Sequence, residues 1–230
     1  MTKLNEGLKH KHSGLLGMTN SWRFAAFILA LTVVSVSLVL FVYAGNITSA
    51  SVTPATLTAG ATSTATVAFT TASEIPANGT IQVTFPTGYN VSAVAIGSGS
   101  CTGMTGTFNT TRDISPRIVT IARQSNGETT AAGAQTCTIT NIQNPQVSGT
   151  TGTYTLITTD GSLTSIDNGT ASGTAITAGA LTVTNVEPAS LVAGASSTVT
   201  VTFTTTNPIP ATGNINVTFP SGFTVSGAGT

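Results

Sequence analysis

Two segments of the chain alternate apolar and polar side chains with a period of two. In both, every second residue is apolar and the residues between them are mostly threonine, alanine or glutamine. This alternation is typical of a β-strand with one buried face. We therefore predict two strands whose inward positions are Ala65, Val67, Phe69, Ile81, Val83 and Phe85.

Similar but shorter patterns predict further strands along the same part of the chain. Pro86 and Gly88 end the second alternating segment and predict a turn, since proline fixes φ and glycine tolerates positive φ. About eight strands of this spacing indicate an all-β fold, an antiparallel immunoglobulin-like β-sandwich. The additional strands are expected over residues 47–52, 89–96, 105–111, 117–122, 136–142 and 153–159.

The alternating segments occur twice. Residues 54–92 align without a gap on residues 188–226, and at least half of the paired positions are identical. Pro54 aligns with Pro188, which gives an offset of 134 residues. A period of this length corresponds to a whole domain rather than to one turn of a solenoid. We expect one β-sandwich module over residues 45–178 and the first part of a second module over residues 179–230.

The second copy stops early. Thr230 aligns with Ile96, so the second copy has no counterpart of residues 97–178. A half sandwich leaves apolar faces and strand edges bare. Two interpretations follow. The favoured one is that the sequence is a fragment of a longer protein, and the alternative is that a partner supplies the missing strands.

Residues 24–44 are uncharged and mostly apolar, and as a helix they would span about 30 Å, the thickness of one bilayer core. Residues 1–23 are basic, which predicts a cytoplasmic tail and an exported part from Gly45 onward. The apolar segment is longer than that of a usual signal peptide, which favours a retained membrane anchor. Cleavage after Ala44 is the alternative, and the exported part would then be secreted.

Composition excludes one class of function. Only 6% of the residues are charged, and Lys3, Lys9 and Lys11 all precede the apolar segment. A nucleic-acid surface requires clustered basic residues, so none is expected. Chains rich in threonine, serine and glycine are often disordered, but the strand pattern argues against disorder here.

Cys101 and Cys137 both lie in the first module. In an oxidising compartment such a pair predicts a disulfide, and a loop of this length would stabilise the fold by about 4 kcal/mol. Two free thiols in the core are the alternative. His10 and His12 lie in the basic tail, so we expect no metal site and no cofactor.

Several asparagines fit the N-x-S/T pattern of N-glycosylation. On an exported domain with few charges, sugars would supply solubility. Chance matches are frequent in threonine-rich sequence, so we expect only some to be modified. The candidates are Asn46, Asn78, Asn90, Asn109, Asn168 and Asn216.

The exported part offers little for catalysis, so we do not expect an enzyme. It has no histidine and no lysine to activate a serine nucleophile, and its carboxylates are isolated in sequence. Residues 160–169 combine acidic and amide side chains with glycine. They suggest a flexible linker or, as the less favoured alternative, a calcium site between modules.

From Gly45 onward, the repeated phrases around Ala59-Gly60-Ala61 and Phe85-Pro86 resemble the tandem immunoglobulin-like modules of microbial and protist surface proteins, such as adhesin stalks and envelope proteins. The phrases are strands and turns, so the resemblance transfers no binding residue. It implies a stalk or spacer at the cell surface, in contact with the membrane through residues 24–44 and with other surface proteins or glycans. The alternative is a filament or coat subunit that accepts a strand from a neighbour.

Overall fold

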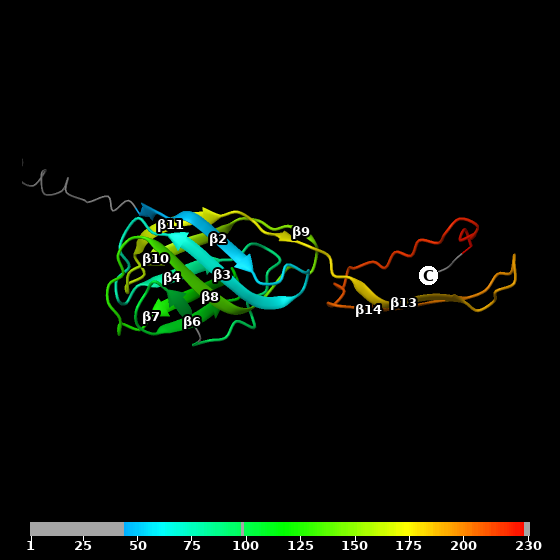
Figure 1. The fold of residues 1–230 in the computed structure, drawn as a ribbon, viewed down its shortest axis with the longest axis horizontal. Coiled ribbons are helices and arrows are strands. Elements are labelled where there is room, and N and C mark those ends of the chain that lie inside the picture. The colour runs from blue at the N-terminus through cyan, green and yellow to red at the C-terminus, as the bar shows by residue number, and fades with distance from the viewer. Residues whose placement is uncertain (1–43, 98, 228–230) are drawn as a thin grey trace, which may run out of the picture. The chain divides into compact units, whose positions relative to one another are not determined.

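The structure is a computed structural model that describes residues 44–97 and 99–227 (Figure 1). Every regular element in this part of the chain is a β-strand, which confirms the all-β prediction. Within these ranges no helix has the length and apolar character needed to cross a bilayer. The predicted tail 1–23 and the predicted membrane segment 24–44 lie outside the described residues, except for Ala44.

Two sheets form the body of the first copy. The six-stranded sheet has, in spatial order, the strands β1 (Gly45–Asn46), β11 (Ser165–Ala171), β10 (Tyr154–Thr159), β4 (Thr80–Thr84), β7 (Ile118–Arg123) and β6 (Phe108–Asp113). The four-stranded sheet has the strands β2 (Thr48–Pro54), β3 (Thr62–Thr70), β8 (Ala134–Gln143) and β5 (Ser100–Thr102). Neighbours in both sheets are antiparallel, except that β1 runs parallel to β11.

Two smaller pairings complete the described strands. Strand β9 (Gly149–Thr150) pairs with β12 (Ala175–Ile176) beside the two sheets. Strand β13 (Leu181–Pro188) pairs with β14 (Val199–Thr205) in the second copy (Figure 1). The predicted module boundaries, 45–178 and 179–230, stay a prediction.

The core of the first copy lies between the two sheets. The alternation of the two repeated strands is confirmed, because all six of their inward side chains are at most 2% exposed. Further core side chains come from β7, β8 and β10. Apolar burial at about 25 cal/mol per Å² is the main stabilising term of such a sandwich.

Three aromatic side chains pack together within this core. The rings of Phe85, Tyr89 and Tyr154 lie with their centroids 5.5 to 5.7 Å apart. The hydroxyl of Tyr154 donates a hydrogen bond of 2.6 Å to that of Tyr89. Burial raises the pKa of Tyr89 well above its usual value, and the hydrogen bond with Tyr154 adds to this.

The predicted strand over residues 89–96 is wrong. Its apolar side chains Tyr89, Val91 and Val94 are buried, but the segment forms only an isolated bridge, between Asn90 and Gln143. The side chain of Asn90 accepts a hydrogen bond from the amide of Ser92, a local turn that competes with strand pairing. Apolar spacing of three between Val91 and Val94 fits this turn rather than a strand.

The predicted linker over residues 160–169 is also wrong. Residues from Ser165 onward form strand β11, which pairs along the whole of β10. Asp160 closes the turn between these strands, since its Oδ1 accepts hydrogen bonds from the amides of Ser162 and Thr164 at 2.9 and 2.8 Å. Strand β11 escaped prediction because its sequence, SIDNGTA, is almost entirely polar.

The other predicted strands agree with the structure to within a few residues. The prediction for 105–111 begins too early, since strand β6 starts at Phe108. Thr105 instead belongs to a loop, where its hydroxyl accepts a hydrogen bond from the amide of Glu128. The three-residue strand β5, around Cys101, was not predicted.

The second copy repeats only part of this architecture. Its first alternating segment forms β14, as predicted, and Gly222 has a positive φ in its turn, similar to that of Gly88. The second alternating segment, residues 215–219, is not a strand in the structure, so that part of the prediction is wrong. Its counterpart β4 in the first copy lies between β7 and β10, and both of these strands come from residues that the second copy lacks.

Candidate functional site

The candidate functional surface is the set of apolar residues that the second copy leaves uncovered. Each of them is between 36% and 57% exposed, whereas its counterpart in the first copy is at most 4% exposed. We call this set the uncovered core positions. They are Leu181, Val186, Val201, Ile209, Ile215, Val217, Phe223 and Val225. Apolar residues that are buried in one copy and exposed in the other are candidates for contact with another protein segment.

Strand pairing explains the difference between the copies. In the first copy, β3 is paired on both sides, with β2 and with β8. Its counterpart β14 pairs with β13, the counterpart of β2, and with no other strand among the described residues. One edge of β14 is therefore open, and an open edge presents backbone groups for a further strand.

The predicted disulfide is confirmed. Cys101 on β5 and Cys137 on β8 are bonded, with their α-carbons 4.0 Å apart. Cys137 is fully buried and Cys101 is 8% exposed. The bond links the short edge strand β5 to its neighbour β8 within the four-stranded sheet, so its role is structural.

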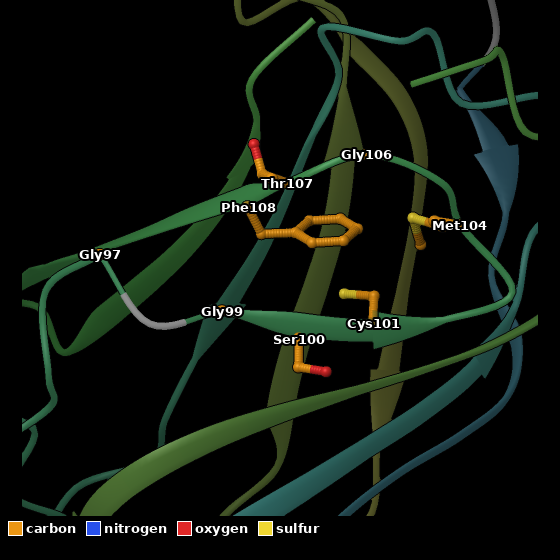
Figure 2. A pocket seen from close by; sticks show the side chains of 8 residues that line it. All are labelled: Gly97, Gly99, Ser100, Cys101, Met104, Gly106, Thr107 and Phe108. Carbon is orange, nitrogen blue, oxygen red and sulfur yellow. The ribbon is translucent and has the colours of Figure 1, made fainter. Parts of the chain in front are cut away.

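A shallow recess of about 430 Å³ lies beside this disulfide (Figure 2). The ring of Phe108 and the side chains of Cys101 and Met104 face it. None of the lining residues is an acid or a base that could activate a hydroxyl group. The lining residues are Gly97, Gly99, Ser100, Cys101, Met104, Gly106, Thr107 and Phe108.

Arg123 is a buried residue that sequence reasoning did not single out. It is 4% exposed, and its guanidinium donates hydrogen bonds of 2.6 to 3.0 Å to four backbone carbonyls, those of Ile75, Pro76, Thr105 and Glu128. Burial lowers the pKa of this guanidinium. The side chain thus connects three loops around one end of the sandwich, which is a structural role.

The other two arginines of the described part also bond to backbone. Arg112 donates to the carbonyl of Val94, and Arg117 donates to that of Phe85. In residues 44–97 and 99–227, no three histidine, cysteine, aspartate or glutamate side chains come close enough to hold a metal ion. The absence of enzymatic activity stays a prediction.

Asp167 on β11 is a second residue that the sequence analysis missed. Its side chain is fully buried. One carboxylate oxygen, Oδ2, accepts a hydrogen bond of 3.2 Å from the amide of Ser73. The other, Oδ1, has no hydrogen-bond partner. The polar composition of β11 concealed this residue, which the sequence analysis had placed in a linker.

The glycosylation candidates are distributed over the surface. Five of the six side chains are exposed, and that of Asn109 is half-buried. The side chain of Asn90 is held in place, since its amide donates to Gln143 at 3.1 Å. Glycosylation of these residues stays a prediction.

Comparison with known proteins finds similarity to solved structures at low sequence identity. No protein-family model matches the chain, and no curated protein sequence matches it. Among solved structures, the bacterial hydrophobin BslA aligns with 59% of this chain and 99% of its own length, at 18% identity and a TM-score of 0.36. The sixth cohesin of scaffoldin B from Acetivibrio cellulolyticus, solved in complex with a Cel5 dockerin, aligns with 56% of this chain and 99% of its own, at 12% identity and a TM-score of 0.29.

Proposed function

We propose that the chain is an exported, non-enzymatic structural protein of the cell surface, in which immunoglobulin-like sandwich modules follow one another as a stalk or spacer. The observation that carries this proposal is the repeat itself. Its two copies share apolar positions, and in the first copy those positions are buried in the core together with residues of β7, β8 and β10. The similar sequence of the second copy is therefore suited to the same fold once equivalent strands cover it.

Three further features support export to the surface. Residues 24–44 are apolar and follow a basic segment, as in a signal anchor or a signal peptide. A disulfide between buried cysteines fits an oxidising compartment. The exposed asparagines in N-x-S/T sequences would allow sugars to replace charge as the source of solubility.

A spacer acts through the packing of its modules and needs no ligand pocket. The recess beside the disulfide has neither an acid nor a base, and the buried Arg123 bonds only to backbone. What repeats between the copies is the apolar alternation of strands and their turns, which specifies packing. Contacts with other surface proteins or glycans would then be made by the module surfaces.

A second candidate function rests on the open edge of β14. Another copy of this chain would supply a strand to that edge and cover the uncovered core positions, so that the protein assembles into a filament or coat by strand addition. Apolar positions that are between 36% and 57% exposed favour this arrangement whenever no further strands follow in the same chain.

A chain completed by design separates the two candidates. Because Thr230 aligns with Ile96, attaching a copy of residues 97–178 after Thr230 would complete the second module. For the spacer, we expect this completed chain to be a monomer in light scattering and to yield two protease-resistant modules. Failure to form a second resistant module would contradict the spacer. Strand addition instead predicts that the 230-residue chain forms concentration-dependent oligomers and that the completed chain forms none.

Surface location is tested on intact cells that produce the protein. Protease added outside the cells should release peptides from residues 45–230, whereas a cytosolic marker protein stays intact. Protection of these residues until the cells are lysed would contradict export.

A further inference from the structure

The buried carboxylate of Asp167 lacks a charged partner. Its side chain is 0% exposed and its Oδ1 accepts no hydrogen bond. A carboxylate in such a position is strongly destabilising unless a cation or several donors compensate for the lost hydration. The single hydrogen bond from the amide of Ser73 does not supply this compensation. A positive group next to Oδ1 would supply this compensation.

The cationic side chains of the described part are engaged elsewhere. This part contains three arginines and no lysine. Arg112, Arg117 and Arg123 each donate to backbone carbonyls of other loops. A partner for Asp167 must come from another kind of group.

Gly45 lies directly against the unpaired oxygen. Strand β1 is parallel to β11, and its register places Gly45 beside Asp167. A β-carbon built on Gly45 would be 1.9 Å from Oδ1, so no larger residue fits there without rearrangement. Since standard covalent geometry places a residue's nitrogen about 2.5 Å from its β-carbon, the nitrogen of Gly45 is at most about 4.4 Å from Oδ1. Rotation about the Cα–C bond of Gly45 would move its nitrogen towards the position of that β-carbon, and so towards Oδ1 of Asp167.

We propose that the peptide bond between Ala44 and Gly45 is cleaved during export, and that the new α-ammonium group of Gly45 forms a buried ion pair with Asp167. In the intact chain the nitrogen of Gly45 belongs to a neutral amide. After cleavage it carries a positive charge at neutral pH, because an α-amino group has a pKa of about 7.7 to 8.0. The cleaved form thus supplies the cation that the buried carboxylate lacks.

The cleavage is an ordinary hydrolysis. One water molecule adds across the bond, Ala44 leaves with a new carboxylate at the end of the leader, and Gly45 gains the amino group and then a proton. The sequence suits a membrane-bound signal peptidase, with small residues on both sides of the bond and Val42 two residues before Ala44. The inference rests on the export proposed above and selects cleavage over a retained anchor.

The first test is the mass of the exported product. The full chain is expressed in a host with a secretory pathway, and the intact protein is recovered from outside the cytoplasm. We expect a single N-terminus at Gly45. An exported product that retains Met1, or one that is cut at another bond, would overturn the inference while leaving export intact. A chain that remains in the cytoplasm would contradict the export itself and, with it, this cleavage.

The second test uses the absence of lysine after residue 44. In the cleaved chain the α-amino group of Gly45 is the only amine, so an amine-reactive ester labels that group alone. An ion pair that raises its pKa by one unit would slow labelling near neutral pH about tenfold relative to the unfolded chain in urea. The variant Asp167→Asn should abolish this protection in the folded protein.

The matched control is Glu74→Gln, which removes an exposed carboxylate next to Ser73 and should leave labelling as slow as in the unchanged chain. If the amine is buried without an ion pair, labelling of Asp167→Asn would be as slow as labelling of the unchanged chain. That result would overturn the inference. If Asp167→Asn does not fold, the pH dependence of labelling in the folded wild type decides. An ion pair moves the midpoint of labelling to a higher pH than in the urea-unfolded chain, whereas burial of an unpaired amine leaves the midpoint unchanged or lowers it, which would overturn the inference.

Discussion

Ile81 and Ile215 occupy the same position of the repeat, yet Ile81 is 0% exposed and Ile215 is 57% exposed. The local sequences around them are nearly the same, with valine two residues later and Phe-Pro after that. The difference therefore comes from the strands around them. Ile81 lies on β4, which β7 and β10 flank, and the described part of the second copy has no counterpart of either strand.

This pair shows where the stability of a module arises. An isolated two-stranded hairpin is at best marginally stable in water, and three or more strands with a covered apolar face are needed. The first copy meets this condition with two sheets, whereas the described second copy has only β13 and β14. The proposed spacer therefore depends on completion of each module by strands that follow its repeated segment.

The disulfide should contribute substantially to the stability of the first module. Cys101 and Cys137 are separated by 36 residues. In the chain-entropy model, replacing both with alanine should lower the free energy of unfolding by about 4 kcal/mol. Urea unfolding of the first module, followed by circular dichroism, measures this change. A reducing agent should destabilise the unchanged chain and have no effect on the variant; equal sensitivity of both would contradict a disulfide.

Arg123 should matter far more than the half-buried Arg112. Replacing Arg123 with methionine removes donors from four carbonyls, and we expect a loss of about 3 kcal/mol or more in the free energy of unfolding. Arg112→Met removes the hydrogen bond to the carbonyl of Val94 and should cost about 1 kcal/mol. The same urea titrations compare the two variants. Equal losses would show that the bonds of Arg123 do not hold the three loops together.

Tyr89 should make the first module sensitive to alkaline pH. Burial raises its pKa in the folded state, so the folded protein keeps the hydroxyl neutral at a pH where the unfolded chain has ionised. The stabilising contribution is complete below about pH 10, the usual tyrosine pKa, and is lost as the pH rises above it. Thermal unfolding between pH 8 and pH 11 checks this. Tyr89→Phe should show a smaller decline over that range, and an identical decline would contradict the assignment.

The sequence predicted those elements whose apolar side chains follow a strict period of two. Strands β3 and β4 have this pattern along their length, and β7, β8 and β10 have it over part of theirs, since one face of each contacts the core. The disulfide was also predictable, because two cysteines in one module leave only a bond between them or two free thiols. These features depend on local sequence and on simple chemistry.

What could not be predicted depends on contacts between distant residues. Strand β11 is polar because only two of its side chains, Asp167 and Ala171, are buried. The burial of Asp167 follows from the parallel pairing of β1 with β11, which joins residues more than a hundred positions apart. An arginine such as Arg123 is usually exposed, so its sequence context does not predict burial. Its role depends on carbonyls from three loops that are brought together only in the folded chain.

Hydrogen–deuterium exchange of the second copy tests the central claim most directly. Amide exchange over residues 181–225 is compared between the 230-residue chain and the chain completed with residues 97–178 after Thr230. We predict rapid exchange in the former and, in the completed chain, protection as strong as that of residues 47–91 in the first module. Rapid exchange that persists in the completed chain, with the first module still protected, would contradict the view that the second copy is an unfinished sandwich module of a surface spacer.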